Sequence, residues 1–265
     1  MSQPTVREEL LGPGLPTLVI GDGPRRLVML PGLAPAPGQP TGRERQLAVS
    51  GWEPLLDQYT VYRIGPRVRP VGTTFDDMAE DVAVVIESLE PPVDLMGAST
   101  GGAIAVTLAA SRPDLVRRLV IVISGIRLSD EAQRQRQIIV GAIEEGRWRR
   151  VFAEMFTISA PSTLWRAALF ELGWLLGPRL VGIPDDPTLI RAQLHAWGSF
   201  DATRAAAAVT SPTLVIGGQR DRVFPPANVR ELADRIPSAH LVIAPGIAHS
   251  WPPNAMADHI APFLG

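Results

Sequence analysis

The sequence predicts an α/β fold in which helices flank a mostly parallel β-sheet. Short apolar runs alternate with helical patterns along most of the 265 residues. Several runs are continuously apolar, such as Leu-Val-Ile-Val-Ile at residues 119–123, and this is typical of strands buried on both faces. Alternating strands and helices favour a parallel sheet, because each helix crosses back over one face before the next strand begins.

Two apolar runs come first, at residues 17–20 and 25–30. Gly-Asp-Gly-Pro separates them at residues 21–24, and this turn signal predicts that the two strands pair as a β-hairpin. Most of the later strand candidates are rich in β-branched residues and have Gly, Pro or Asp close to their ends. These candidates lie at residues 60–64, 93–96, 119–123, 213–216 and 241–244.

Two helices have clear starting signals. Thr74 precedes apolar residues at the 3-4 spacing of a helix, and Asp76 and Asp77 stand in the first turn, where the helix dipole favours acids. Pro226 opens a second pattern whose apolar residues share one face. Both helices follow predicted strands, as the α/β fold requires.

Residues 125–200 break the alternation, because they contain helical pattern and no good strand candidate. Four of the six Trp and four of the seven Phe lie in or at the end of this region. Two interpretations are open for these aromatic residues. They form a helical core of their own, or, if the region lies over the carboxyl ends of the strands, they line a pocket. One apolar helical stripe consists of Trp148, Val151, Phe152, Met155 and Phe156.

The composition excludes several kinds of chemistry. All 25 basic residues are Arg, and there is no Lys and no Cys. Schiff-base, P-loop lysine, thiolate, disulfide and iron–sulfur chemistry are therefore ruled out. The net charge of −2 gives no electrostatic footprint for nucleic acid or an anionic membrane. Without a signal-peptide pattern or an uninterrupted apolar run of about 18 residues, we expect a cytoplasmic protein that does not span a membrane.

The strongest motif is Gly-Ala-Ser-Thr-Gly-Gly at residues 97–102, which stands between a predicted strand and a predicted helix. Side chains at Gly97 and Gly101 would clash with the neighbouring helix and strand in so tight a turn. The turn would hold Ser99 in a strained conformation above the sheet, next to the helix N-terminus. We therefore expect Ser99 to be a nucleophile rather than part of a purely structural turn.

A serine nucleophile needs a base, and the chain has four His. His249 follows the last predicted strand, on the side of the sheet where Ser99 must lie, so we expect it to be the base. His240 stands at the opposite edge of the sheet, at the start of that strand, and His259 falls in the terminal helix. His195, in the helical region, is a candidate for substrate contact only.

The orienting acid is expected at Asp221. This residue follows the predicted strand at residues 213–216, on the same sheet edge as Ser99 and His249. Its alternative interpretation is a solvated side chain paired with a neighbouring Arg. The other loop that could supply an acid follows residues 119–123, and its first carboxylate is Asp130.

The chain order Ser99, Asp221, His249 together with the motif resembles the α/β-hydrolase fold family over essentially the whole chain. The resemblance implies an eight-stranded, mostly parallel sheet with a helical cap inserted after the sixth strand. Residues 1–124 and 201–265 would form the core, and residues 125–200 would form the cap. A serine nucleophile argues against the dehalogenases and epoxide hydrolases of the family, which use Asp.

The same resemblance implies an oxyanion hole made by two backbone N–H groups. Thr100 follows the nucleophile, and Leu33 lies in the loop after an early strand, so these two residues are expected to supply the donors. The chain departs from many members at Pro31, where they carry His, and at Ala248, where they carry Gly. Neither change removes a catalytic group.

We therefore expect a serine esterase that cleaves a small-molecule carboxylic ester with an apolar group, without a metal or other cofactor. Thioesterase, lactonase, C–C hydrolase, acyltransferase and cofactor-free haloperoxidase activities remain alternatives on this fold, as does a non-enzymatic ligand-binding protein. The Arg residues of the helical region suggest a docking patch for an acidic acyl carrier, although acidic residues are interleaved with them. The predicted pocket residues are Phe152, Phe156, Trp174, His195 and Trp197.

Overall fold

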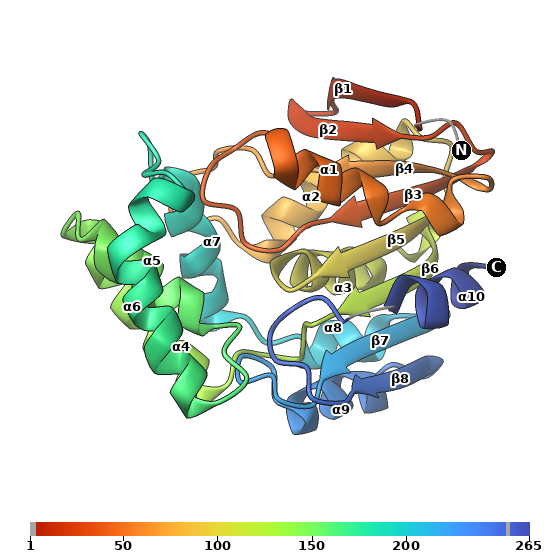
Figure 1. Ribbon diagram of the computed structural model, residues 1–265. Helices are drawn as coiled ribbons and strands as arrows, with labels where there is room; N and C mark the ends of the chain where they lie inside the picture. The colour runs from red at the N-terminus through yellow and green to blue at the C-terminus, as the bar shows by residue number, and fades with distance from the viewer. Residues whose placement is uncertain (1–3, 253–254) are drawn as a thin grey trace.

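The apolar runs of the sequence form one eight-stranded β-sheet in the computed structural model, which describes residues 4–252 and 255–265 (Figure 1). The strand order is β1-β2-β4-β3-β5-β6-β7-β8, and among the described strands β2 alone runs in the opposite direction to the rest. The prediction of a mostly parallel, eight-stranded sheet is confirmed. The strands are β1 (Val6–Leu11), β2 (Leu15–Ile20), β3 (Arg25–Leu30), β4 (Tyr59–Ile64), β5 (Val93–Ala98), β6 (Val116–Val122), β7 (Thr213–Gly218) and β8 (Ala239–Ala244).

The predicted hairpin between β2 and β3 is wrong, because β4 lies between these two strands. Their link crosses the start of β4, and a Cβ at Gly23 would lie only 2.2 Å from the Tyr59 backbone N. Gly23 is therefore needed because the chain passes close to the backbone of β4 at this point, and not because it forms a hairpin turn. The actual hairpin joins β2 to β1, an edge strand that no apolar run marks because its side chains are mostly exposed and three of the six are charged.

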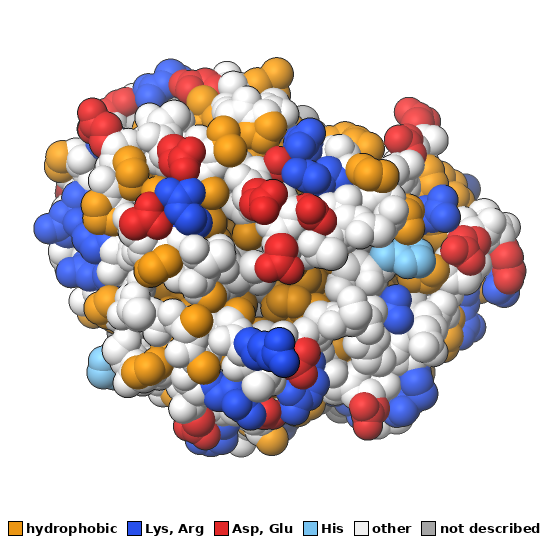
Figure 2. Space-filling model, turned by 180° about the vertical axis from the view of Figure 1, so that it is seen from behind, with side chains coloured by type: hydrophobic (Ala, Val, Ile, Leu, Met, Phe, Trp, Pro, Cys, Tyr) orange, Lys and Arg blue, Asp and Glu red, His pale blue; other side chains and the backbone are white. Residues whose placement is uncertain are grey.

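Helices cover both faces of the sheet (Figure 1). Phe75, Val106 and Val229 belong to the apolar cluster on the face of α2, α3, α8 and α9, whereas Trp52 and Leu264 belong to the cluster on the opposite face. On the face seen from behind, acidic and basic side chains are intermixed (Figure 2). The flanking helices are α1 (Gly42–Ser50), α2 (Phe75–Glu87), α3 (Thr100–Ser111), α8 (Thr203–Ala208), α9 (Pro226–Arg235) and α10 (Ala261–Leu264), with 3₁₀ turns at Glu53–Leu55 and Pro113–Leu115 and a π-helical turn at Met256–Ile260.

The two predicted helix starts are confirmed. Thr74 is the N-cap of α2 and forms a capping box with Asp77, in which each side chain accepts a hydrogen bond from the other residue's backbone N–H. These bonds satisfy donors that the first turn of a helix leaves open. Pro226 is the first residue of α9, where its missing N–H costs the helix no hydrogen bond.

Between β6 and β7 the chain forms four consecutive helices before α8, as the helical pattern predicts. The arrowheads of β3, β5 and β7 point toward this group, so it lies beside the carboxyl ends of these strands (Figure 1). Several of its buried residues, among them Ile139, Val151 and Leu194, form a separate apolar cluster, whereas Trp197 belongs to the cluster on the face of α2. We call this group the helical insertion; it consists of α4 (Asp130–Glu144), α5 (Trp148–Thr157), α6 (Thr163–Leu180) and α7 (Thr188–Ser199).

None of the described helices combines the length and the apolar character that crossing a membrane would need.

Candidate active site

Ser99 stands at the sharp turn between β5 and α3, with φ of 50° and ψ of −112°. A Cβ at Gly97 would lie 2.2 Å from the Gly101 carbonyl oxygen, and one at Gly101 would lie 2.1 Å from the Leu30 carbonyl oxygen. Both distances are far below van der Waals contact, so these positions need glycine. The backbone is thus forced into a strained left-handed conformation that directs Ser99 away from the sheet.

Ser99, His249 and Asp221 form one hydrogen-bonded row. Ser99 Oγ lies 3.0 Å from His249 Nε2, and His249 Nδ1 lies 2.8 Å from Asp221 Oδ2. The second carboxylate oxygen, Oδ1, accepts hydrogen bonds from the backbone N–H groups of Val223 (2.8 Å) and Phe224 (3.0 Å). A carboxylate held in this way places a proton on Nδ1 and leaves Nε2 as an acceptor for the serine hydroxyl.

The loops that carry Asp221 and His249 pack directly on each other. A Cβ at Gly218 would lie 2.6 Å from the Ile247 carbonyl oxygen, so the histidine loop can cross the end of β7 only over a glycine. The Arg220 backbone N–H donates to the same Ile247 oxygen at 2.7 Å. From the helical insertion, Ser159 Oγ donates to the backbone oxygen of His249 at 2.9 Å. No motif in the sequence points to Ser159.

The loop after β3 lies next to Ser99, since a Cβ at Gly32 would be 3.5 Å from the Ser99 Cβ. Gln193 of α7 holds this loop by accepting from the Ala34 N–H at 3.2 Å and donating to the Ala34 carbonyl at 3.3 Å. Within the described residues, the backbone N–H groups of Leu33 and Thr100 have no hydrogen-bond acceptor. Free amides beside a nucleophile can donate to an oxyanion.

A cavity with a volume of about 970 Å³, part of it open to solvent, lies above Ser99 between the sheet and the helical insertion. Its walls are mostly apolar, and Trp197 is among the residues that line it. The Trp197 Nε1–H also donates to Thr100 Oγ1 at 3.2 Å. The other side chains on the cavity wall include Leu33, Ile123, Leu128, Ala132, Gln135, Arg136, Ile139, Met155, Ile158, Ser159, Leu194, Val223, Phe224 and His249.

Four of the predicted pocket residues do not line this cavity, and for them the prediction is wrong: Phe152, Phe156, Trp174 and His195. Phe152 is buried between α5 and α6, where a Cβ at Gly177 would lie 2.3 Å from its Cβ. The apolar stripe of α5 therefore largely packs against another helix, which its periodicity alone could not reveal. Trp174 is partly exposed on α6 and stacks on Phe170, and His195 lines a separate cavity.

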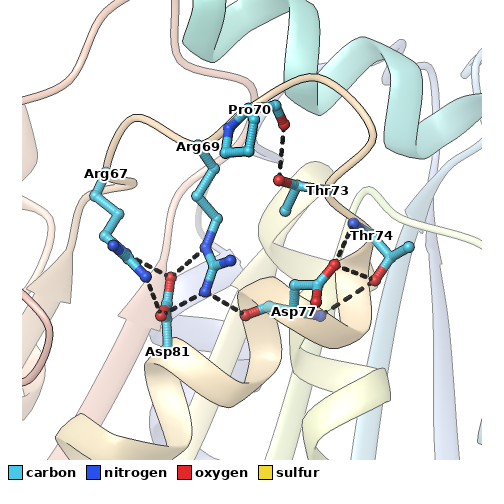
Figure 3. A network of polar contacts seen from close by, with 7 residues as sticks. All are labelled: Arg67, Arg69, Pro70, Thr73, Thr74, Asp77 and Asp81. Carbon is cyan, nitrogen blue, oxygen red and sulfur yellow. Dashed lines mark hydrogen bonds and ion pairs between the residues drawn. The ribbon is translucent and has the colours of Figure 1, made fainter.

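A second cavity, with a volume of about 560 Å³ that includes space open to solvent, shares Gly32 and Thr100 with the first. Arg67 and Arg69 lie at its edge, and each guanidinium makes two hydrogen bonds of 2.7–2.9 Å to Asp81 of α2 (Figure 3). Burial alone would raise the pKa of Asp81, but the hydrogen bonds and positive charges of the two Arg lower it overall. This network attaches the loop after β4 to α2 behind the candidate oxyanion hole.

In the described part of the chain, no group of three or more His, Asp or Glu side chains is arranged to hold a metal ion.

A family model for the alpha/beta hydrolase fold matches residues 42–250, which include Ser99, Asp221 and His249. The chain belongs to the alpha/beta hydrolase family. The resemblance noted from the motif is thereby confirmed. In this alpha/beta hydrolase the three loops meet because β5, β7 and β8 belong to the parallel part of the sheet, so that their carboxyl ends lie at one edge.

Curated relatives of this alpha/beta hydrolase have different activities in their names. A candidate carbamate hydrolase, RutD of Pseudomonas syringae, is 26% identical over 67% of this chain and 69% of its own. A pimeloyl-[acyl-carrier protein] methyl ester esterase of Neisseria meningitidis is 26% identical over 70% of each chain. The crystal structure of a candidate non-heme bromoperoxidase, BpoC of Mycobacterium tuberculosis, superposes with a TM-score of 0.74 at 23% identity, covering 97% of this chain and 98% of that one.

Proposed function

We propose that this alpha/beta hydrolase is a serine esterase that cleaves carboxylic esters with an apolar portion through an acyl-enzyme. The hydrogen-bonded row of Ser99, His249 and Asp221 carries the proposal. It supplies a nucleophile, a base whose unprotonated Nε2 faces the serine hydroxyl, and a carboxylate that orients the base. The mostly apolar cavity above Ser99 supports an apolar substrate. A relative named as a methyl ester esterase supports ester chemistry.

In the proposed mechanism, His249 Nε2 takes the proton of Ser99 as Oγ attacks the ester carbonyl carbon. The negative charge that moves onto the carbonyl oxygen is stabilised by the N–H groups of Thr100 and Leu33, each worth on the order of 10²–10³ in rate. The bond to the alcohol oxygen then breaks, and His249 protonates the departing alcohol. Water, deprotonated by His249, then attacks the acyl carbon; the bond to Ser99 Oγ breaks, His249 returns the proton to Oγ, and the carboxylic acid is released.

We infer that residues 125–200 act as a cap, which supplies much of the apolar wall facing Ser99. Several of the Arg in this part of the chain already have acidic partners: Arg127 pairs with Asp201 and Glu231, and Arg150 pairs with Glu154. These pairs reduce the positive patch that an acidic acyl carrier would need. A carrier-bound acyl substrate stays a prediction, and activity on it that is insensitive to salt would count against electrostatic docking.

The test is labelling by a fluorophosphonate together with turnover of p-nitrophenyl esters of increasing chain length. We expect wild type to be labelled on Ser99, and Ser99→Ala to lose both labelling and turnover. Ser111→Ala, an exposed serine at the end of the same helix α3, is the matched control and should behave like wild type. Labelling that persists in Ser99→Ala would refute the assignment. Absence of turnover in wild type on esters, thioesters and lactones would favour a ligand-binding protein.

A further inference from the structure

Arg136 of α4 reaches the wall of the cavity that contains Ser99. Apart from His249, it is the only ionisable side chain among the described residues that line this cavity. The wall around it is mostly apolar and includes Ile139 and Leu194. A permanent positive charge thus faces the same space as the candidate nucleophile.

The guanidinium of Arg136 is held by neutral groups. Nε donates to Gln133 Oε1 at 2.9 Å, and Nη1 donates to the Leu194 carbonyl oxygen at 3.2 Å. The group lies against α7, where a Cβ at Gly198 would be 3.4 Å from its atoms. A guanidinium has five N–H donors, so these two bonds fix its position and leave other donors available.

The described residues give Arg136 no acidic partner, in contrast to other Arg of the helical insertion. Arg150 pairs with Glu154, and Arg166 pairs with Glu131. Burial lowers the pKa of Arg136, and no nearby carboxylate offsets this effect. The guanidinium lies near the carboxyl-terminal end of α7, whose dipole compensates only part of the cost of a partly desolvated cation. An anion in the cavity would supply the missing partner.

Building on the proposed esterase function, we propose that Arg136 selects esters whose acyl chain ends in a carboxylate, that is, half-esters of aliphatic dicarboxylic acids. The ester carbonyl would lie at Ser99, the methylene chain against the apolar wall, and the free carboxylate on the open donors of Arg136. Planar guanidinium and carboxylate groups match in two parallel hydrogen bonds, which makes Arg suited to this selection.

The test compares monomethyl and dimethyl esters of the same aliphatic dicarboxylic acids, with four to eight carbons. We expect wild type to favour the monoanionic ester in kcat/KM by on the order of tenfold or more, as for hydrogen bonds to charged groups. Arg136→Gln should abolish most of this preference, and Arg136→Lys should retain part of it. A merely structural link between α4 and α7 would change both substrates alike and leave their ratio as in wild type.

Arg134→Gln is the matched control, because Arg134 is exposed on the same helix and does not line the cavity. It should keep the wild-type ratio. A wild-type enzyme without preference, or an unchanged ratio in Arg136→Gln, would overturn the proposal while Ser99-dependent turnover still supports the esterase.

A binding measurement keeps the two proposals separable if no ester is cleaved. Calorimetry of Ser99→Ala with the monomethyl and dimethyl esters should give at least a tenfold tighter Kd for the anionic ligand, and the additional Arg136→Gln change should remove the difference. Equal affinities would refute selection by Arg136. Tighter binding of the anionic ligand without any turnover by wild type would support selection by Arg136 and refute the proposed esterase function.

Discussion

Replacing Asp221 by Asn tests how the candidate site controls the histidine. Oδ1 of Asp221 accepts from the N–H groups of Val223 and Phe224, while Oδ2 faces His249 Nδ1 at 2.8 Å. The amide of Asn must keep its oxygen on the two N–H donors, since facing them with NH₂ would leave both unpaired in a buried site. That would cost about 1–3 kcal/mol for each donor. The Asn NH₂ group therefore points at His249.

An NH₂ group that faces Nδ1 reverses the role of the histidine. Nδ1 must become the acceptor, so the proton moves to Nε2, which then donates to Ser99 and can no longer take its proton. Loss of the correct tautomer in a Ser-His-Asp site lowers kcat by about 10⁴, which corresponds to about 5 kcal/mol in the barrier. Because the side chain keeps its shape and its two backbone bonds, we expect little change in stability.

The assay is kcat for a p-nitrophenyl ester, with the denaturation midpoint measured on the same samples. Asp130→Asn is the control, since Asp130 is an exposed residue in the first turn of α4 and was the alternative acid. It should retain wild-type turnover. If Asp221→Asn keeps kcat within tenfold of wild type, the orienting acid lies elsewhere and the tautomer argument fails.

Two further predictions concern stability. Asp81→Asn removes the charge that Arg67 and Arg69 share and should lower the free energy of unfolding by about 1–3 kcal/mol at neutral pH. Because the pKa of Asp81 in the folded protein is lowered from 3.8, the difference in unfolding free energy between wild type and variant should persist above pH 3.8 and shrink as pH falls through the folded pKa. Denaturant titrations at several pH values measure this difference, and a value that does not change with pH would contradict the prediction. Gly177→Ala should destabilise by about 1–3 kcal/mol through overlap with Phe152, whereas Gly141→Ala, with open space around it, should stabilise by about 0.5–1 kcal/mol. Equal effects of these two substitutions in thermal or denaturant unfolding would refute the packing argument.

Strands buried on both faces were predictable from the sequence because the side chains on both of their faces are mostly apolar, which gives a continuous apolar run. β6 and β7 lie within one or two residues of the expected position at their carboxyl ends, where the site loops begin. β1 was not predictable in this way, because an exposed edge strand needs no apolar face. The hairpin between β2 and β3 was predicted wrongly for a different reason. Gly21 and Gly23 indicate a sharp change of chain direction, but they do not show which strand lies beside β2.

The three loops of the candidate site were predictable for a topological reason. In a parallel sheet the carboxyl ends of neighbouring strands share one edge, so loops after β5, β7 and β8 meet there even though 150 residues separate Ser99 from His249. The pocket was less predictable. An amphipathic helix such as α5 shows which side is apolar but not whether that side meets another helix or a cavity. Phe152 meets Gly177 of α6, while Met155 of the same helix reaches the cavity.

The contacts between the two parts of the site suggest a division of roles. Ser99, Asp221 and His249 stand on loops whose geometry is set by backbone crossings of the sheet at Gly97, Gly101 and Gly218. The helical insertion reaches these loops through a few polar contacts, among them Ser159 on the His249 backbone. Its residues supply much of the wall that a substrate would touch. Changes within the insertion should therefore alter which substrate is bound before they alter the chemistry, because the hydrogen bonds that set the histidine tautomer lie wholly within the sheet loops.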